Sequence, residues 1–148
     1  MTIMKIAIGN DHAAEELKNV IRDYVKELGH EVVDFGVGEG ESCHYPDMGA
    51  KVGRAVMEED YDCGILICGT GVGISIAANK VKGIRACCCS DHFSAKFTRL
   101  HNDSNVLCLG GRVVGAGVAC ELVDLFLETE FEGGRHANRV AKIMAIEE

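Results

Sequence analysis

The sequence predicts an α/β protein, folded as a three-layer αβα sandwich around a five-stranded parallel sheet. Two observations carry this prediction. Short apolar segments alternate with amphipathic segments along the whole chain, which is typical of strands joined by helices. The apolar segments are followed by stretches long enough for the helical crossovers that parallel strands require. We therefore expect helices on both faces of the sheet.

The first half of the chain supplies two of the strands. The amphipathic segment between them carries apolar residues at helical spacing and ends at Gly29, a common helix terminator. A loop rich in glycine and glutamate then leads to Pro46, the single proline of the chain, and a further helix. The predicted elements are strands over 5–9 and 31–35 and helices over 13–28 and 47–59.

The second half continues the same alternation without a linker, a repeat or a low-complexity segment. We therefore expect residues 1–148 to form a single domain. The predicted elements are strands over 64–68, 84–89 and 105–109 and helices over 73–81, 94–100, 117–128 and 135–146.

A Rossmann-like strand order, 2-1-3-4-5, is the arrangement that we expect for this sheet. In such sheets ligands bind beyond the carboxyl ends of the strands, where the strand order reverses. Here that point lies between the first and third strands, which are followed by residues 10–12 and 68–70. Both polar segments are then expected in one crevice, to which the later strands add residues 90–92 and 110–112.

The composition excludes several functional classes. The formal net charge of −8 argues against a nucleic-acid surface, which needs a basic stripe, although a local basic pocket for a phosphorylated metabolite is still possible. No apolar stretch approaches the roughly 20 residues of a membrane helix, and the first residues lack the apolar core of a signal peptide. We expect a cytoplasmic protein without nucleic-acid or membrane partners.

The eight cysteines are expected to be free thiols, since no secretory signal precedes them. Cys87, Cys88 and Cys89 are consecutive in a predicted strand, where neighbours face opposite ways and cannot form one ligand cluster. None of the eight falls into a Cys-x2-Cys pair, so we expect no metal site of that kind.

Residues 63–75, CGILICGTGVGIS, form the most informative motif of the chain. An apolar strand ends in Cys68, and a glycine-rich turn into a helix follows at once. Gly69, Gly71 and Gly73 allow the backbone to approach a ligand closely, and the outward N–H groups of such a turn favour an anion. The motif predicts a thiol at the mouth of an anion-binding loop.

Each chemical candidate has a structural alternative. Cys68 is a candidate base or nucleophile, or a buried strand cysteine. Asp11 and His12 follow the first strand, where they could bind substrate, or cap a helix and occupy an exposed loop. His101 could be a general acid and Asn102 could bind a hydroxyl, yet both residue types are common at helix ends.

A basic cluster near the C-terminus stands out in this acidic chain. Arg135 and Arg139 lie four residues apart and share a face if the segment is helical. Guanidinium groups suit phosphate, and Arg112 is a third candidate, while a solvated basic face is the structural alternative.

Dinucleotide binding is the competing interpretation of the glycine-rich loop. The dinucleotide fingerprint requires a third glycine where this chain has Ile74, and it normally follows the first strand instead of the third. Asp91, about 20 residues further on, matches the position of a ribose-binding acid. A nucleotide-dependent oxidoreductase therefore stays open as an alternative.

With these residues in place, the chain closely resembles the type B ribose-5-phosphate isomerases, a family that includes galactose-6-phosphate and allose-6-phosphate isomerases. The resemblance covers nearly the whole length, and residues 64–79 are specific enough to support it by themselves. It rests on residues 8–12, 45–46, 65–79, 101–103, 111–115 and 131–136.

The resemblance implies aldose–ketose isomerisation of ribose 5-phosphate and ribulose 5-phosphate through a cis-enediolate, in the non-oxidative pentose phosphate pathway, without metal or cofactor. Cys68 would be the base, since the position where some members carry a glutamate is not acidic here. His101 would open the sugar ring, with Asp11 as a possible partner, and Thr70 would lie near the exchanging oxygens. The implied anion hole comprises Gly69, Thr70, Gly71, Val72 and Gly73.

The resemblance also implies a phosphate site and self-association. Tyr45 and Asn102 would line the site, and family members are homodimers or dimers of dimers, so the last helix would belong to the interface and serve a neighbouring site. A hexose 6-phosphate substrate, or a non-catalytic sugar-phosphate binder, are the alternatives. His92 would border the substrate or simply begin a surface helix. The implied phosphate ligands are His12, Arg112, Arg135 and Arg139.

Overall fold

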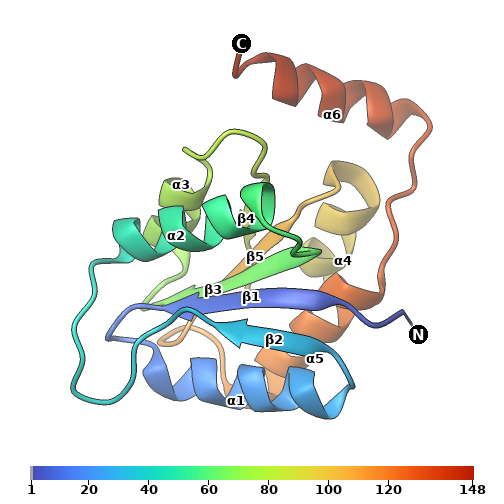
Figure 1. Cartoon of the computed structure of the whole chain (residues 1–148). Helices are drawn as coiled ribbons and strands as arrows, with labels where there is room; N and C mark the ends of the chain where they lie inside the picture. The colour runs from blue at the N-terminus through green and yellow to red at the C-terminus, as the bar shows by residue number, and fades with distance from the viewer. Residues whose placement is uncertain (1) are drawn as a thin grey trace.

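The computed structural model describes residues 2–148, and within them five parallel strands form one sheet in the order β2-β1-β3-β5-β4 (Figure 1). The predicted fold class, a parallel sheet between helical layers, is confirmed. The strands are β1 (Lys5–Asn10), β2 (Glu31–Asp34), β3 (Cys63–Cys68), β4 (Ala86–Cys88) and β5 (Val106–Gly110).

Six helices of the described chain follow the strands, each within a few residues of its predicted position. α2 begins earlier than expected, because Pro46 is accommodated in its first turn. α3 ends earlier, at Ala78 instead of near residue 81. The helices are α1 (Glu15–Glu27), α2 (Tyr45–Glu58), α3 (Val72–Ala78), α4 (His92–Asn102), α5 (Ala116–Glu128) and α6 (Arg135–Ala145).

The central strands are apolar on both faces because helices cover both. Side chains alternate along β3, so that Ile65 and Ile67 pack with α1 and α5 while Leu66 and Cys68 pack with α2 and α3. These two half-cores lie on opposite sides of the sheet. The thiol of Cys68 therefore belongs to the side of the sheet covered by α2 and α3.

The predicted order of the last two strands is wrong, because β5 lies next to β3 and β4 forms the edge. All five residues of β5 are buried, which requires a strand neighbour on each side and a helix on each face. The three residues of β4 are partly exposed, and Cys88 is open to solvent. The edge is the position that such a short, half-covered strand tolerates.

This order decides which face α4 covers. Parallel crossovers are right-handed, so a helix that leads back toward the centre of the sheet lies on the opposite face from one that leads outward. The chain moves outward through α3 to β4 and returns through α4 to β5. Accordingly Ala95 of α4 packs into the same half-core as Leu17 of α1 and Leu122 of α5. α4 therefore lies across the sheet from Cys68.

The outer edge of β4 is closed by a side chain. The amide of Asn79 donates to the carbonyl of Ala86 at 2.9 Å and accepts from its N–H at 2.8 Å. These are the hydrogen bonds that a further strand would make. Asn79, the last residue of the segment 64–79, therefore has a structural role at the edge of the sheet.

α6 stands apart from the three layers and is reached through an extended segment (Figure 1). It packs against α4, and the carboxylate of Glu147 beyond its end accepts from the N–H of Gly83 at 3.0 Å. His136 is the buried residue of this helix. The apolar residues Ile143 and Ile146 are exposed, with 82% of Ile146 accessible.

An ion pair between the buried Lys18 and a carboxylate at the edge of the sheet fixes α1 to β2. The ammonium of Lys18 lies 2.7 Å from the carboxylate of Asp34 on β2, and Arg22 approaches the same oxygen at 3.1 Å. Burial raises the pKa of the Asp34 carboxyl, but hydrogen bonds from Lys18, from the Gly36 N–H and from Arg22 outweigh it, so the net pKa is lowered.

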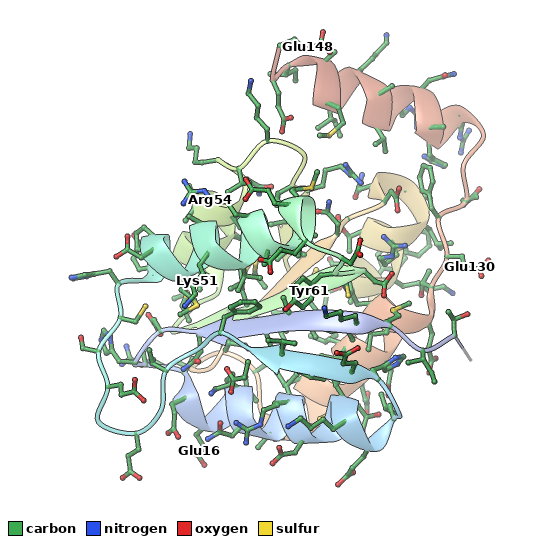
Figure 2. All side chains as sticks on the ribbon, viewed as in Figure 1. Glu16, Lys51, Arg54, Tyr61, Glu130 and Glu148 are labelled. Atoms are coloured by element: carbon green, nitrogen blue, oxygen red, sulfur yellow. The ribbon has the colours of Figure 1, made fainter. Side chains whose placement is uncertain are left out.

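Many other charged groups lie on the surface, as Figure 2 shows for Glu16 on α1 and Glu130 after α5. None of the helices in residues 2–148 has both the length and the apolar character needed to cross a membrane.

Candidate active site

Cys68 is the last residue of β3, and its buried sulfur accepts a hydrogen bond from the backbone N–H of Gly71 at 3.1 Å. An N–H directed at sulfur stabilises negative charge on it, as other donors do for anions. The thiol therefore lies at the end of β3, and the turn that follows holds its sulfur through this hydrogen bond.

The turn requires glycine at Gly71, whose φ of +82° lies in the left-handed region. A Cβ there would also lie 2.8 Å from the backbone of Leu109 on β5. The β3–α3 loop is therefore packed directly against the end of the neighbouring strand.

Two backbone hydrogen bonds join the loops after β3 and β5. The N–H of Gly111 donates to the carbonyl of Cys68 at 2.8 Å, and the N–H of Arg112 donates to the carbonyl of Gly69 at 3.0 Å. The guanidinium of Arg112 consequently lies over Gly69, where a Cβ would be 3.6 Å from Nη1. A positive charge therefore borders the glycine-rich loop.

The loop amides are divided between internal bonds and free donors. The N–H of Gly71 binds Cys68, and the N–H of Val72 donates to Oγ1 of Thr70 at 3.2 Å. Across the part of the chain that the structure covers, the amides of Gly69, Thr70 and Gly73 donate to no protein acceptor. Three N–H groups are therefore available to an anion beside the thiol.

Asp11 follows β1 and lies next to β3, since its N–H donates to the carbonyl of Ile67 at 3.2 Å. Its carboxylate accepts from the N–H of Ala13 at 3.0 Å and so shapes the turn after β1. The helix-capping alternative for Asp11 is wrong, because the N-cap of α1 is Ala14 and no side chain caps this helix. The fully buried Asn10 clamps the loop after β2 by exchanging hydrogen bonds with the backbone of Val37.

The loop after β2 brings two more predicted residues to the same end of the sheet. Nδ1 of His12 lies 3.2 Å from the carbonyl of Cys43, and because a carbonyl accepts, Nδ1 carries the proton and Nε2 faces outward free. The ring of Tyr45 covers Gly73 so closely that a Cβ there would lie 2.6 Å from it. Gly73 is thus required for this contact.

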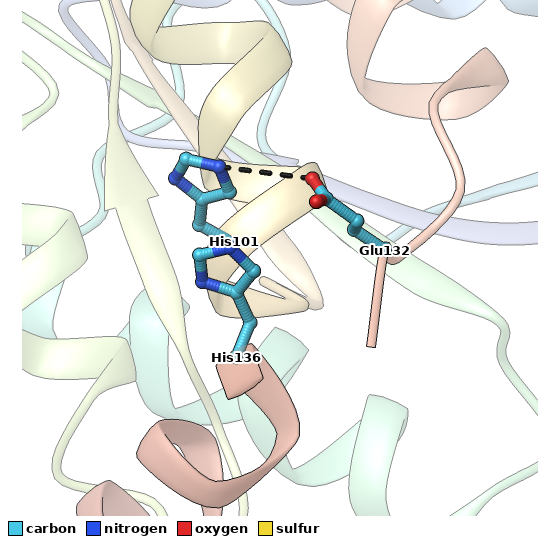
Figure 3. A group of neighbouring side chains, drawn as sticks. All are labelled: His101, Glu132 and His136. Carbon is cyan, nitrogen blue, oxygen red and sulfur yellow. Dashed lines mark ion pairs between the residues drawn. The ribbon is translucent and has the colours of Figure 1, made fainter. Parts of the chain in front are cut away.

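His101 belongs to a second group, away from Cys68. It lies about 13 Å along α4 from His92, toward the amino ends of the strands, given the helical rise of about 1.5 Å per residue. Its ring is stacked on His136 with centroids 4.0 Å apart, meets Phe97 edge-on at 4.9 Å, and places Nε2 3.8 Å from the carboxylate of Glu132 (Figure 3).

Arg135 and Arg139 extend this second group on α6, where both are exposed. Asn102 ends α4 beside His101. Between residue 2 and residue 148, no hydrogen bond or ion pair links these residues to Cys68 or its loop. One chain therefore holds the predicted site as two separate groups. His92 is in neither, since it pairs with Glu121 on the surface.

Comparison with known proteins identifies the fold and the motif together. The family model described as Ribose/Galactose Isomerase matches residues 6–143. This chain belongs to that family. The family resemblance predicted from the sequence is thereby confirmed over nearly the full length of the chain.

Individual members of the ribose/galactose isomerase family are close relatives. The ribose-5-phosphate isomerase B of Escherichia coli is 51% identical over 144 residues, covering 97% of each chain. The ribose-5-phosphate isomerase B structure from Clostridium thermocellum is 56% identical with a TM-score of 0.95, covering 97% of each chain. A third, from Mycoplasma genitalium with bound ribulose 5-phosphate, is 41% identical with a TM-score of 0.89, covering 97% of this chain and 95% of its own.

Three other cysteines of this family member, Cys63, Cys88 and Cys108, have raised pKa values. Burial raises the pKa of Cys63 to about 12 and that of Cys108 well above its ordinary value. Burial, together with Cys68 and Cys87, also raises the pKa of Cys88, whose sulfur touches the carbonyl of Thr70. The sequence treats Cys88 as a packing residue, and its place at the rim of the loop follows from the strand order.

Proposed function

We propose that this chain is an aldose–ketose isomerase that interconverts ribose 5-phosphate and ribulose 5-phosphate. The observation that carries the proposal is the hydrogen bond from Gly71 to the sulfur of Cys68, inside a loop with three free amides. A base beside preorganised N–H donors is what proton transfer next to a carbonyl requires. The relatives of the same family that act on this sugar phosphate support the choice of substrate.

Ring opening is assigned to His101 and Asp11. The imidazolium of His101 gives its proton to the ring oxygen as the bond from that oxygen to C1 breaks. Asp11 accepts the proton of the 1-hydroxyl group, so that C1 becomes the aldehyde carbon. The substrate then lies in its open form over the thiol.

Proton transfer is assigned to Cys68. Its thiolate removes the proton from C2, and the electron pair of that bond forms the enediolate with its charge on O1. The amides of Gly69, Thr70 and Gly73 stabilise this charge, and one such donor is typically worth about 3–4 kcal/mol in the transition state. The thiol then returns the proton to C1, while Thr70 moves a proton from O2 to O1.

The phosphate provides binding energy far from the reacting carbons. Arg112 borders the glycine-rich loop and His12 contacts the segment after β2, and both are assigned as phosphate ligands of the same chain. Tyr45 closes the site over Gly73. Arg135, Arg139 and Asn102 are assigned to the site formed with a second copy of the chain.

We infer that the working unit is a homodimer in which Cys68 of one copy meets His101 of the other. Both residues are needed at one substrate, yet they lie across the sheet from each other in one chain. The apolar side of α6 is open, and a groove of about 460 Å³ between it and β4 includes Ile84, Ile143 and Ile146. A second copy packed there would cover these residues and complete both sites.

We also infer that the enzyme works in the cytoplasm. All eight cysteines are free thiols, and the proposed mechanism needs one of them reduced. A reducing compartment maintains that state.

The proposal is tested by following ketose formation from ribose 5-phosphate, allose 6-phosphate and galactose 6-phosphate in EDTA. We expect turnover of ribose 5-phosphate, its loss in Cys68→Ala, and its retention in Cys120→Ala, the same change on α5 outside the site. Turnover of a hexose phosphate alone would keep the mechanism and change the substrate. An active Cys68→Ala variant would remove the base assignment, and an inactive wild type would favour a sugar-phosphate binder.

A further inference from the structure

Three metal-binding side chains meet outside the glycine-rich loop. They are His101 at the end of α4, Glu132 in the segment after α5 and His136 in the first turn of α6, with one donor atom of each lying within 4.8 Å of the others. Figure 3 shows the two imidazole rings one above the other and the carboxylate beside them. The N–H of Glu132 donates to the carbonyl of Leu100 on α4 at 3.1 Å, and the packing of α6 on α4 adds His136.

His136 carries the second observation that points to a ligand. The residue is 4% exposed, and Nε2 has no hydrogen-bond partner anywhere in residues 2–148. A buried polar atom without a partner costs free energy and is rare in folded proteins. Burial and the neighbouring His101 lower the pKa of His136, which keeps the imidazole neutral with a lone pair free.

We propose that His101, Glu132 and His136 bind a divalent transition-metal ion, and that the bound ion inhibits the isomerase by occupying His101. Two imidazoles and one carboxylate suit Zn²⁺ or Ni²⁺, whereas Mg²⁺ and Ca²⁺ prefer oxygen ligands. This is a reversible inhibitory site, separate from the proton-transfer chemistry at Cys68.

The two imidazole rings must rotate out of their stacked arrangement to bind one ion. Ligand atoms around a tetrahedral zinc ion lie about 3.4 Å apart, because each is about 2.1 Å from the metal. Nε2 of His101 and the Glu132 carboxylate are already 3.8 Å apart. The stacked rings, inclined by 11°, must tilt so that both nitrogens face one point.

Access and charge set the strength of the site. The side chains of His101 and Glu132 are 37% and 56% exposed, so an ion can enter and keep water in its remaining positions. Glu132 and the net charge of −8 attract a cation. Arg135 and Arg139, which lie on α6 with His136, repel it. We therefore expect binding that chelators reverse.

Binding is measured by calorimetric titration of the whole protein with Ni²⁺. We expect Glu132→Gln to weaken the site at least about tenfold, since even indirect partners of a metal contribute tenfold or more. Glu130→Gln removes the same charge from the same segment outside the cluster and should bind as the wild type does. His136→Gln should weaken the site as Glu132→Gln does. The Glu132-sensitive binding should show no thiolate-to-metal absorption, which separates it from the cysteines.

Inhibition is measured with ribose 5-phosphate, and this part rests on the proposed role of His101 in ring opening. Ni²⁺ should lower the turnover rate of the wild type, and EDTA should restore it. The Glu132→Gln variant should need at least about tenfold more Ni²⁺ for the same fractional loss of turnover. Equal affinity of Glu132→Gln and Glu130→Gln for Ni²⁺ would overturn the site. Binding that depends on Glu132 but leaves turnover intact would support the site and contradict the role of His101.

Discussion

The backbone N–H of Gly71 donates a hydrogen bond to the sulfur of Cys68 across 3.1 Å. The donor is a residue in the left-handed region, held against β5, so the position of the thiol depends on the packing of two neighbouring strands. The thiol and the glycine-rich loop are therefore parts of one structural unit.

The thiol itself is the first thing to test. Cys68→Ser should lower kcat by about 10²–10⁴-fold, the usual contribution of a positioned acid–base group, because a hydroxyl is a much weaker base. Calorimetry should show that ribulose 5-phosphate still binds. Cys88→Ser, the same change at the rim of the loop, should keep kcat within a few fold, and an equal loss in both variants would argue against a specific base.

Gly71→Ala tests the conformation of the loop. The left-handed backbone costs a non-glycine residue about 1–2 kcal/mol, and contact with Leu109 adds strain, so the free energy of unfolding should fall by about 2–4 kcal/mol in urea. Gly117→Ala, in α5 with open space around it, should be neutral or up to about 1 kcal/mol more stable. Similar stability of the two variants would contradict the strained conformation.

The proposed sharing of the site between two copies predicts complementation between inactive variants. Cys68→Ala and His101→Asn should each be inactive, yet unfolding and refolding them together should restore about a quarter of wild-type activity. Half of the dimers would be mixed, and each mixed dimer would hold one intact site and one doubly altered site. Activity that stays at zero in a verified mixed dimer would place both residues in the site of one chain.

Asp34 predicts a stability change in acid. Burial raises the pKa of its carboxyl, but hydrogen bonds from Lys18, Gly36 and Arg22 lower this pKa by a larger amount. The folded pKa therefore lies below the unfolded value. The ionised Asp34 carboxylate contributes its full stabilisation of the folded state above about pH 4, which is the unfolded pKa. This stabilisation is lost as the pH falls through the folded pKa. In urea unfolding, the deficit of Asp34→Asn should therefore shrink toward low pH.

Ile21→Val is the control for that series, since it removes one buried methyl group from the same helix and no polar contact. Its deficit should be the same at each pH because no ionisable group is involved. A deficit of Asp34→Asn that does not change with pH would show that the ion pair is not responsible.

Sequence periodicity predicts the elements well and the order of the last two strands poorly. Residues 84–89 and 105–109 are both apolar in the sequence, and three cysteines count as apolar whether they are buried or not. Position in the sheet depends instead on which run is buried on every side. The residues of β5 are buried on every side, whereas Cys88 of β4 is exposed.

The same distinction applies to the candidate site. The loop after Cys68 can be predicted because its residues are adjacent in the chain. The place of Arg112 over Gly69 cannot, since it requires β5 to lie beside β3. The distance of His101 from Cys68 likewise follows from the face that α4 covers, which spacing along the chain does not encode.

The position of β5 between β3 and β4 also has a consequence during synthesis. β3 ends at residue 68 and β5 at residue 110, so 42 further residues must be made before β3 gains its second neighbour. At about 5–20 residues per second this takes about 2–8 s, during which β4 has emerged but has no strand to join. At this stage the nascent chain therefore exposes an unpaired strand edge of apolar residues, which is open to pairing with other chains.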